Sequence, residues 1–231
     1  VYGVQANLFT EYIPTPEHAE MMIYPRVLAL AEVAWSAPSK KNYEDFHVRA
    51  LKAVEELKKS GYNPFELKNE IGNRPGADKP VEHLAVGKKV TYGLDAAYYP
   101  GYAAGGDTAL VDGVRGGWTY GDKRWQGFID KKRMDITIDL EKETELHFIG
   151  ADFMQVCGPE VFMPAEVIIS ISDDGKDFTE LKHIEHKVVK DDKVTFTNFG
   201  WEGNAKGRYV RYQATSGEFG GFLFTDEVVI K

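Results

Sequence analysis

The sequence predicts a mainly β protein, in which an antiparallel β-sandwich follows a short helical segment. Glycine marks the change, because 4 of the 23 glycines precede residue 78 and 19 follow it. The glycine-rich part is also rich in aromatic and β-branched residues, which is typical of strands joined by turns. The charge differs as well: the net charge is −1 for residues 1–77 and −7 for residues 78–231. The chain therefore divides into two regions of different character.

The first region, residues 1–68, is predicted to contain a short strand and several helices. The strand covers residues 2–9. Helices are expected over residues 17–23, 27–35 and 42–60. The helix at 27–35 is apolar almost all round, so it must be covered on most of its sides. The other short helices cannot cover it, so this helix needs the rest of a larger domain, the neighbouring domain or a second copy.

Residues 69–80 are predicted to form a linker, because glycine, proline and charged residues replace apolar ones there. Residues 81–231 are the expected sandwich. Its strands are predicted at residues 89–92, 133–139, 145–151, 165–172, 188–199, 208–215 and 222–230. The sequence Asp173-Asp174-Gly175-Lys176 has the chemistry of a hairpin turn.

Composition excludes several classes of protein. The net charge of −8 argues against broad binding of nucleic acid or anionic membranes. No run of 18 apolar residues is present, so no membrane span is expected. The single cysteine, Cys157, excludes an internal disulfide and a cysteine-based zinc cluster. The chain begins at Val1 without methionine, and the uncovered helix at 27–35 favours truncation over processing as the explanation.

The opening VYGVQANLFTEYI and the later PEHAEMMIYPRVLALAEVAWS occur in order at a specific spacing. They resemble the end of the catalytic barrel in family 20 glycoside hydrolases, the β-N-acetylhexosaminidases. The resemblance implies that residues 1–68 are the last βα element of a TIM barrel. It also implies a parent enzyme that removes terminal GlcNAc or GalNAc by a substrate-assisted retaining mechanism, in which the acetamido oxygen of the substrate attacks the anomeric carbon.

The resemblance also identifies candidate sugar contacts in the first region. A Trp-Thr-Glu motif of the family matches Phe9, Thr10 and Glu11, with phenylalanine in place of tryptophan. Glu11 would accept hydrogen bonds from sugar hydroxyls, and Phe9 would lie under the sugar ring. The alternative is that Glu11 caps the following loop and Phe9 belongs to a core. The family's catalytic Asp-Glu pair follows a His-x-Gly-Gly sequence that these 231 residues do not contain, so we expect the chain alone to be inactive.

A second group of motifs extends over about residues 82–231. They include GGDTALVDG at 105–113, WQGF at 125–128 and ISDDGKDF at 171–178. They resemble the discoidin-type or coagulation factor type C domain, a galactose-binding-like jelly roll related to family 32 carbohydrate-binding modules. The resemblance implies a structural Ca²⁺ held by Ala109, Asp112 and Glu227. Gly116-Gly117 stands where the family often has a hydroxyl residue. A metal-free turn with Asp112 capping backbone amides is the alternative.

Sugar binding by the sandwich would use aromatic side chains on loops at one end. The candidates are Tyr98, Tyr99, Trp118 and Trp201. The expected ligands are glycans containing GlcNAc, GalNAc or Gal, the expected protein partner is the rest of the catalytic barrel, and the expected location is extracytoplasmic, either periplasmic or secreted. Aromatic residues also fill sandwich cores. The alternative function is therefore a non-catalytic module that braces the barrel and binds no glycan.

Overall fold

The chain forms two compact units, Val1–Asn73 and Arg74–Lys231. A computed structural model describes residues 3–11, 13, 15–68, 74, 76–77, 79–93, 97–129, 134–190 and 194–231. Arg74, which the sequence analysis assigns to the linker, belongs to the second unit and is buried there. Among these described residues, no helix combines the length and the apolar character needed to cross a membrane.

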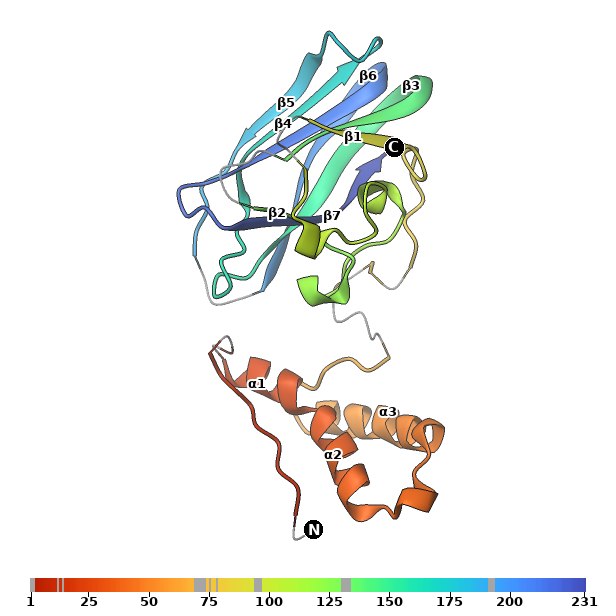
Figure 1. Ribbon diagram of the computed structural model, residues 1–231, viewed down its shortest axis with the longest axis vertical. Coiled ribbons are helices and arrows are strands. Elements are labelled where there is room, and N and C mark those ends of the chain that lie inside the picture. Colours follow the sequence, from red (N-terminus) through yellow and green to blue (C-terminus); the bar gives the residue numbers. More distant parts are fainter. Residues whose placement is uncertain are drawn as a thin grey trace. The chain divides into compact units, whose positions relative to one another are not determined.

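The described part of the first unit is helical (Figure 1). It comprises α1 (Pro16–Ile23), α2 (Arg26–Trp35), the 3-10 helix η1 (Pro38–Lys40) and α3 (Tyr43–Lys59). The side chain of Thr15 accepts a hydrogen bond from the backbone N–H of His18 and caps α1. Asn42 caps α3 in the same way through the N–H of Asp45 at 3.0 Å. The three predicted helices are confirmed, and these caps explain where α1 and α3 begin, whereas α2 has no side-chain cap.

The predicted strand at residues 2–9 is wrong over its described part. Residues 3–10 lie outside any strand, and the described residues of the first unit offer no second strand as a partner. Backbone N–H and C=O groups of a strand need a neighbouring strand to pair with. A strand-like sequence pattern is therefore not sufficient to form a strand at residues 3–9, because no neighbouring strand is present among the described residues of this unit.

Helix α2 is only partly covered within the first unit. None of its residues is buried, and the side chains of Val33 and Trp35 are 53% and 91% exposed. The buried apolar side chains among the described residues of this unit are few, with Met21 in α1 and Ala50 and Val54 in α3. The apolar helix therefore exposes the surface that the sequence predicts should be covered.

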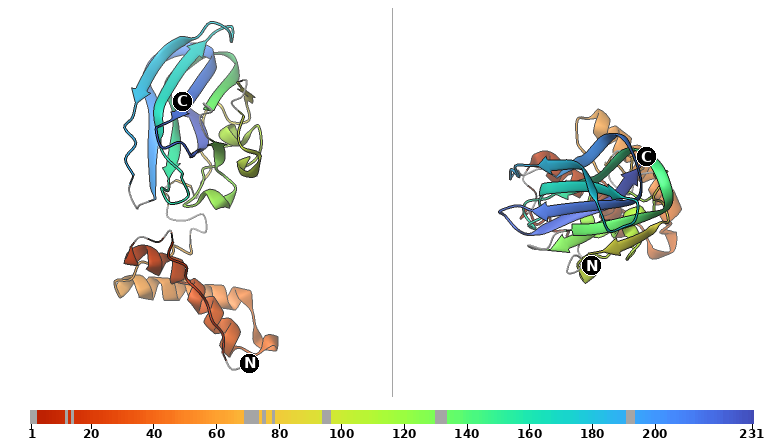
Figure 2. Two further views of the ribbon diagram at one scale, coloured as in Figure 1. Left: turned by 60° about the vertical axis from the view of Figure 1, so that its left-hand side comes forward. Right: turned by 90° about the horizontal axis from the view of Figure 1, so that it is seen from above.

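The second unit is an antiparallel sandwich (Figures 1 and 2). Its strands are β1 (Lys89–Tyr92), β2 (Gln126–Ile129), β3 (Met134–Gln155), β4 (Pro164–Ser172), β5 (Thr179–Glu185), β6 (Thr195–Ser216) and β7 (Phe222–Ile230). The hydrogen-bonded order is β2-β7-β3-β6-β4-β5, and β1 pairs with β3. Short 3-10 helices lie at η2 (Pro100–Tyr102), η3 (Ala109–Val111) and η4 (Tyr120–Asp122). The predicted mainly β sandwich after a helical segment is confirmed.

Strand β3 pairs with different partners along its length. Its first half pairs with β1, its second half pairs with β7, and β6 accompanies both halves. The register shifts between Asp139 and Thr144, and Glu141 adopts a φ of 71° there. Such irregularities bend a strand. The separate strands predicted at 133–139 and 145–151 are therefore parts of one bent strand over their described residues, since residue 133 lies outside the described part of the chain.

Two of the strands were not predicted, and one was misplaced. Strand β2 is only four residues long and contains Gly127, and β5 has an exposed pattern that carries little hydrophobic signal. The strand predicted at 188–199 is misplaced: among its described residues, only Thr195 and those after it lie in a strand, where they form the start of β6. Short or exposed strands are positioned by their neighbours, so sequence pattern alone detects them poorly.

Apolar side chains from both layers fill the sandwich core. They include Leu110, Phe128, Ile136, Phe153, Tyr212 and Leu223. The hairpin turn after β4 has the predicted position, and Gly175 adopts a φ of 73° in it. This core fixes η3 against β7, and these two elements carry the candidate cation site.

Candidate cation site and glycan-binding surface

Glu227 on β7 has a fully buried carboxylate with an uneven set of partners. Its Oε1 atom lies 2.6 Å from His83 Nε2 and accepts the backbone N–H of Gly113 at 2.8 Å. Its Oε2 atom has no hydrogen-bond partner among the described residues. Burial raises the pKa of Glu227, and the hydrogen bonds from His83 and Gly113 oppose that rise. A buried oxygen without a donor is costly, so Oε2 marks a place where a cation would stabilise the fold.

The Asp112-Gly113 turn lies beside Glu227. Asp112 follows η3, and its Oδ1 accepts the N–H of Val114 at 2.8 Å. Gly113 has a φ of 77°, a conformation that favours glycine, and its N–H points to the Glu227 carboxylate. The charge of Asp112 also contributes to the raised pKa of Glu227. The structure thus brings together the two acidic residues that the sequence singled out.

A divalent cation at this turn would depend on backbone oxygens. Among the described residues, no three His, Cys, Asp or Glu side chains form a metal-binding group. Ca²⁺ accepts carbonyl oxygens together with carboxylates. Ala109, whose carbonyl the family resemblance implies as the third ligand, opens η3 directly before this turn. The unpartnered Oε2 of Glu227 and this oxygen-only chemistry fit Ca²⁺.

The neighbouring Asp226 serves a different environment from Glu227. Its carboxylate pairs with the guanidinium of Arg74 and accepts the N–H of Gly116 at 2.9 Å. Burial raises the pKa of Asp226, and the charge of Arg74 opposes the rise. Both side chains are 0% exposed, and each carboxylate is held by its own partners, Asp226 by Arg74 and Glu227 by His83. Neither carboxylate is therefore placed to reach a substrate, although the two residues are adjacent in sequence.

Tyr98 and Tyr99 lie in the loop before η2, and their environments differ. The Tyr98 hydroxyl donates to Asp107 Oδ1 at 2.8 Å, and this hydrogen bond raises the pKa of Tyr98. Tyr99 is 43% exposed and meets the ring of Phe222 edge-on at 5.7 Å. Tyr99 therefore presents an aromatic surface at the edge of an aromatic cluster, whereas the hydroxyl of Tyr98 is already engaged.

The two tryptophan candidates lie elsewhere. Trp118 is in a loop, and its ring meets that of Phe196 edge-on at 6.1 Å. Trp201 lies within β6 opposite Ile149 and packs partly against the core. The expectation that Trp201 belongs to a loop is wrong, because β6 continues through it from Thr195.

Phe219 is a surface aromatic that the sequence analysis missed. It lies in the loop between β6 and β7, is 36% exposed and has Lys190 Nζ 4.2 Å from its ring centroid. The ring of Phe162 lies 5.4 Å away. The sequence signal was an aromatic residue among the glycines of Gly217–Gly221, where a turn exposes a side chain. An exposed ring beside an ammonium group suits a hydroxylated ligand.

Phe9 and Glu11 in the first unit are both exposed, and Phe9 is 81% exposed. Phe9 is therefore not part of a core among the described residues of this unit. Glu11 lies in a turn in which the N–H of Ile13 donates to the carbonyl of Thr10 at 3.1 Å. Their exposure leaves both side chains accessible.

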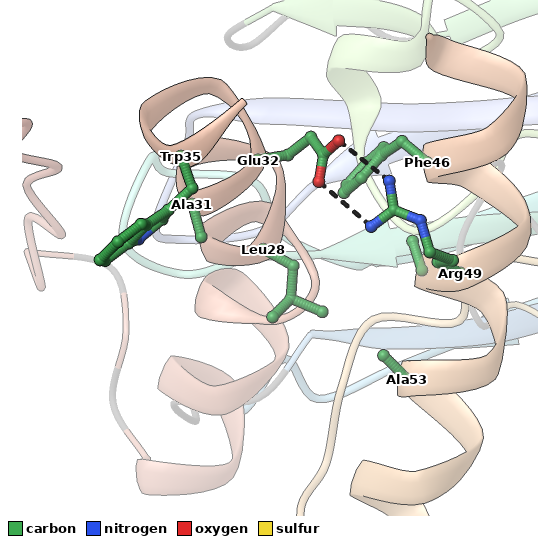
Figure 3. Close-up of a pocket in the computed structure, with 8 residues that line it drawn as sticks. Leu28, Ala31, Glu32, Trp35, Phe46, Arg49 and Ala53 are labelled. Atoms are coloured by element: carbon green, nitrogen blue, oxygen red, sulfur yellow. Dashed lines mark hydrogen bonds and ion pairs between the residues drawn. The ribbon is translucent and has the colours of Figure 1, made fainter. Parts of the chain in front are cut away.

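A groove of about 310 Å³ lies between α2 and α3 in the first unit (Figure 3). Its lining is Leu28, Ala31, Glu32, Trp35, Phe46, Arg49, Ala50 and Ala53. Arg49 donates to both oxygens of Glu32, at 2.9 and 3.1 Å. The rest of the lining is apolar, so this groove resembles an uncovered packing surface more than a sugar site.

The family described as F5/8 type C domain matches residues 95–228, more than half of the chain. The chain belongs to the F5/8 type C domain family. The matched residues lie within the second unit and include both acidic residues of the candidate cation site. The expected discoidin-type resemblance is confirmed.

The first unit of this F5/8 type C protein matches a second family over residues 1–38, described as Glycosyl hydrolase family 20, catalytic domain. The chain is 43% identical over 63 residues to a Beta-hexosaminidase of Porphyromonas gingivalis, covering 27% of this chain and 8% of that protein. It is 41% identical over 49 residues to a Beta-N-acetylhexosaminidase of Cellulomonas fimi, covering 21% and 10%. The chain thus spans a small share of these relatives, and the expected resemblance to family 20 is confirmed.

Solved structures similar to the F5/8 type C unit include binding modules. One is a fucose binding module of Streptococcus pneumoniae, with 18% identity, a TM-score of 0.45 and coverage of 65% of this chain and 98% of that chain. Another is chitosan-binding module 1 of a chitosanase/glucanase from Paenibacillus sp. IK-5, with 15% identity, a TM-score of 0.44 and coverage of 65% and 98%.

Proposed function

We propose that the second unit is a carbohydrate-binding module attached to the C-terminal segment of a β-N-acetylhexosaminidase barrel. The observation that carries this proposal is the order of two matches in one chain. Residues 1–38 match a family 20 catalytic domain, and residues 95–228 match an F5/8 type C domain. The exposed apolar surface of α2 supports the proposal, because a barrel helix is covered by its neighbouring barrel helices. The rest of the barrel is the proposed partner of this surface.

The proposed glycan surface includes Tyr99 and Phe219. Both rings are exposed on loops of the second unit, and both rest on other aromatic rings. An aromatic face packs against the apolar face of a pyranose, and the ammonium of Lys190 can donate to sugar hydroxyls. Tyr98, Trp118 and Trp201 are less suitable, because each is only partly exposed and the Tyr98 hydroxyl already donates to Asp107. The proposed ligands contain GlcNAc, GalNAc or Gal.

Calorimetric titration of the 231-residue chain with oligosaccharides of GlcNAc, GalNAc and Gal tests this proposal. We expect millimolar or tighter binding to one class, weakened at least about tenfold by Tyr99→Ala or Phe219→Ala. Tyr43→Ala is the matched control, because Tyr43 is an exposed tyrosine of the first unit. If the chain binds none of the three classes, the alternative function is favoured, in which the second unit braces the barrel and binds no glycan. The partial burial of Tyr98, Trp118 and Trp201 supports that alternative.

The proposed activity of the whole enzyme is substrate-assisted, retaining hydrolysis of terminal GlcNAc or GalNAc. In it, Glu11 accepts hydrogen bonds from hydroxyls of the terminal sugar and Phe9 lies under the ring. The burial of both Asp226 and Glu227 supports an acid pair located outside these 231 residues. A chromogenic N-acetylglucosaminide should therefore remain uncleaved by this chain. Turnover that Glu11→Ala abolishes would contradict the proposal.

The proposed cation is Ca²⁺, held by Glu227, Asp112 and the carbonyl of Ala109. Its chemistry would be structural, neutralising buried negative charge and closing the turn onto β7. The support is the buried, unpartnered Oε2 of Glu227. Addition of Ca²⁺ should raise the thermal midpoint of the chain, and Glu227→Gln should remove that increase. The proposed location is extracytoplasmic, either periplasmic or secreted, which agrees with the proposed action on external glycans.

A further inference from the structure

His83 is a buried side chain with partners on both ring nitrogens. Its side chain is 0% exposed. Nδ1 accepts the backbone N–H of Ala85 at 3.3 Å, and the N–H of Ile230 lies 3.5 Å from the same atom. An accepting Nδ1 carries no proton, so in the neutral ring Nε2 carries it. Nε2 therefore donates to Glu227 Oε1 at 2.6 Å.

The backbone around His83 is fixed at both ends. The N–H of Val81 donates to the carbonyl of Gly113, and the N–H of Leu84 donates to the carbonyl of Ile230, both at 2.8 Å. The segment 81–85 thus bridges the Asp-Gly turn and the end of β7. His83 is held between the two elements that provide the candidate cation ligands.

The consequence is a carboxylate with one oxygen occupied and one free. Oε1 of Glu227 has two donors, His83 Nε2–H and the N–H of Gly113. A carboxylate held by two donors on one oxygen cannot rotate without losing both hydrogen bonds. Oε2 is then the atom left for another partner, and it is buried without one. Asp112, which follows η3, adds a second negative charge at the same turn.

We propose that His83 is a positioning residue for a divalent cation, which it orients Glu227 to bind through Oε2. This inference rests on the cation site proposed above. It adds a residue that is distant from the Asp-Gly turn in sequence and that would not itself bind the metal. Groups that orient metal ligands commonly change metal affinity by about 10- to 100-fold when they are replaced.

Calorimetric titration of the 231-residue chain with Ca²⁺ tests the inference. We compare the unchanged chain with His83→Gln, His83→Asn, His83→Leu and Glu227→Gln. Glutamine keeps an N–H donor near the position of Nε2, asparagine is too short to reach Oε1, and leucine has no donor. We expect affinity within about threefold of the unchanged chain for glutamine and a loss of at least about tenfold for asparagine and leucine. Glu227→Gln should abolish binding.

Two further measurements separate the possible failures. Circular dichroism without Ca²⁺ identifies variants that retain the fold, and the asparagine variant replaces the leucine variant if leucine prevents folding. His147→Gln is the control, because His147 is an exposed histidine near an amide oxygen of Asn204. If the unchanged chain binds no Ca²⁺, the cation site and the role of His83 are both overturned. If folded His83→Asn or His83→Leu binds as tightly as the unchanged chain, only the role of His83 is overturned.

Discussion

The guanidinium of Arg74 and the carboxylate of Asp226 form a buried ion pair across 152 positions of sequence. The side chain of Arg74 is 3% exposed and that of Asp226 is 0% exposed. The same guanidinium donates to the carbonyl of Gly116 at 2.5 Å and lies 4.6 Å from the ring centroid of Trp125. A charge this deeply buried is tolerated only when its hydrogen bonds are made. Arg74 therefore fastens the start of the second unit to its last strand.

Replacing Arg74 should destabilise the second unit strongly. Arg74→Met leaves the Asp226 carboxylate buried without its counterion, and such losses cost about 3–5 kcal/mol. Urea unfolding followed by tryptophan fluorescence measures the change, because Trp125 lies against Arg74.

A second variant separates charge from packing in this prediction. Arg74→Met combined with Asp226→Asn removes both charges of this pair, while Asp152, the second partner of Arg74, keeps Arg115. The double variant should therefore be less destabilising than Arg74→Met alone. Lys79→Met is the control, because Lys79 is exposed. A loss below about 1 kcal/mol for Arg74→Met would contradict a structural role for the pair.

The ion pair also shows what the sequence could and could not predict. Helices α1 and α3 were predictable because Thr15 and Asn42 cap them through neighbours three residues away. Arg74 looked like a linker residue because its partners lie on distant strands and loops. The pattern Asp-Gly and a late glutamate predicted Asp112 and Glu227 through a family resemblance, but His83 carried no such signal. Local chemistry is readable from sequence, whereas contacts between distant segments require the fold.

The start of the stable second unit should lie at Arg74 rather than at residue 81. A chain of residues 74–231 keeps the ion pair with Asp226, and a chain of residues 81–231 loses it. We expect the longer chain to be more stable by at least about 2 kcal/mol, because Asp226 otherwise remains buried without a cation. Urea midpoints of the two chains measure the difference.

The cause of that difference is testable with a third chain. This third chain contains residues 74–231 and carries Arg74→Met, so it has the length of the longer chain but lacks the guanidinium. If the ion pair causes the difference, the third chain should be as unstable as the chain of residues 81–231. Equal stability of all three chains would place the boundary nearer to residue 81, as the sequence alone suggested.

Gly116 should not tolerate a side chain. A Cβ atom there would lie 2.2 Å from Nε1 of the buried Trp125, which donates to the carbonyl of Gly117 at 3.2 Å. Overpacking of this kind typically costs about 1–3 kcal/mol, and Gly116→Ala should lie at the upper end because both backbone and ring are fixed. Gly87→Ala is the control: its φ is 72° with open space around the Cβ, so only backbone strain of about 1 kcal/mol is expected. Similar thermal midpoints for the two variants would contradict the predicted collision.

Asp174 should make the stability of the second unit depend on pH in the acidic range. Its Oδ1 accepts the backbone N–H groups of Asp177 at 3.0 Å and Lys176 at 2.8 Å, and the hydroxyl of Ser172 at 2.9 Å. These hydrogen bonds lower the pKa of Asp174 to about 2 from its ordinary value of 3.8. Because the pKa is lower in the folded protein, the stabilisation is present above pH 3.8 and is lost as pH falls through about 2.

Asp174→Asn should therefore lose less free energy of unfolding than the unchanged chain as pH falls from 3.8 toward 2. Asparagine can still accept hydrogen bonds in the turn, but it does not titrate in this range. Urea unfolding at several pH values gives the two slopes, and carboxyl ¹³C chemical shifts give the titration midpoint of Asp174. Asp173→Asn is the matched control, because its carboxylate accepts none of the three hydrogen bonds above. Parallel stability curves for Asp174→Asn and the unchanged chain would contradict the prediction, because they would show that folding does not lower the pKa of Asp174.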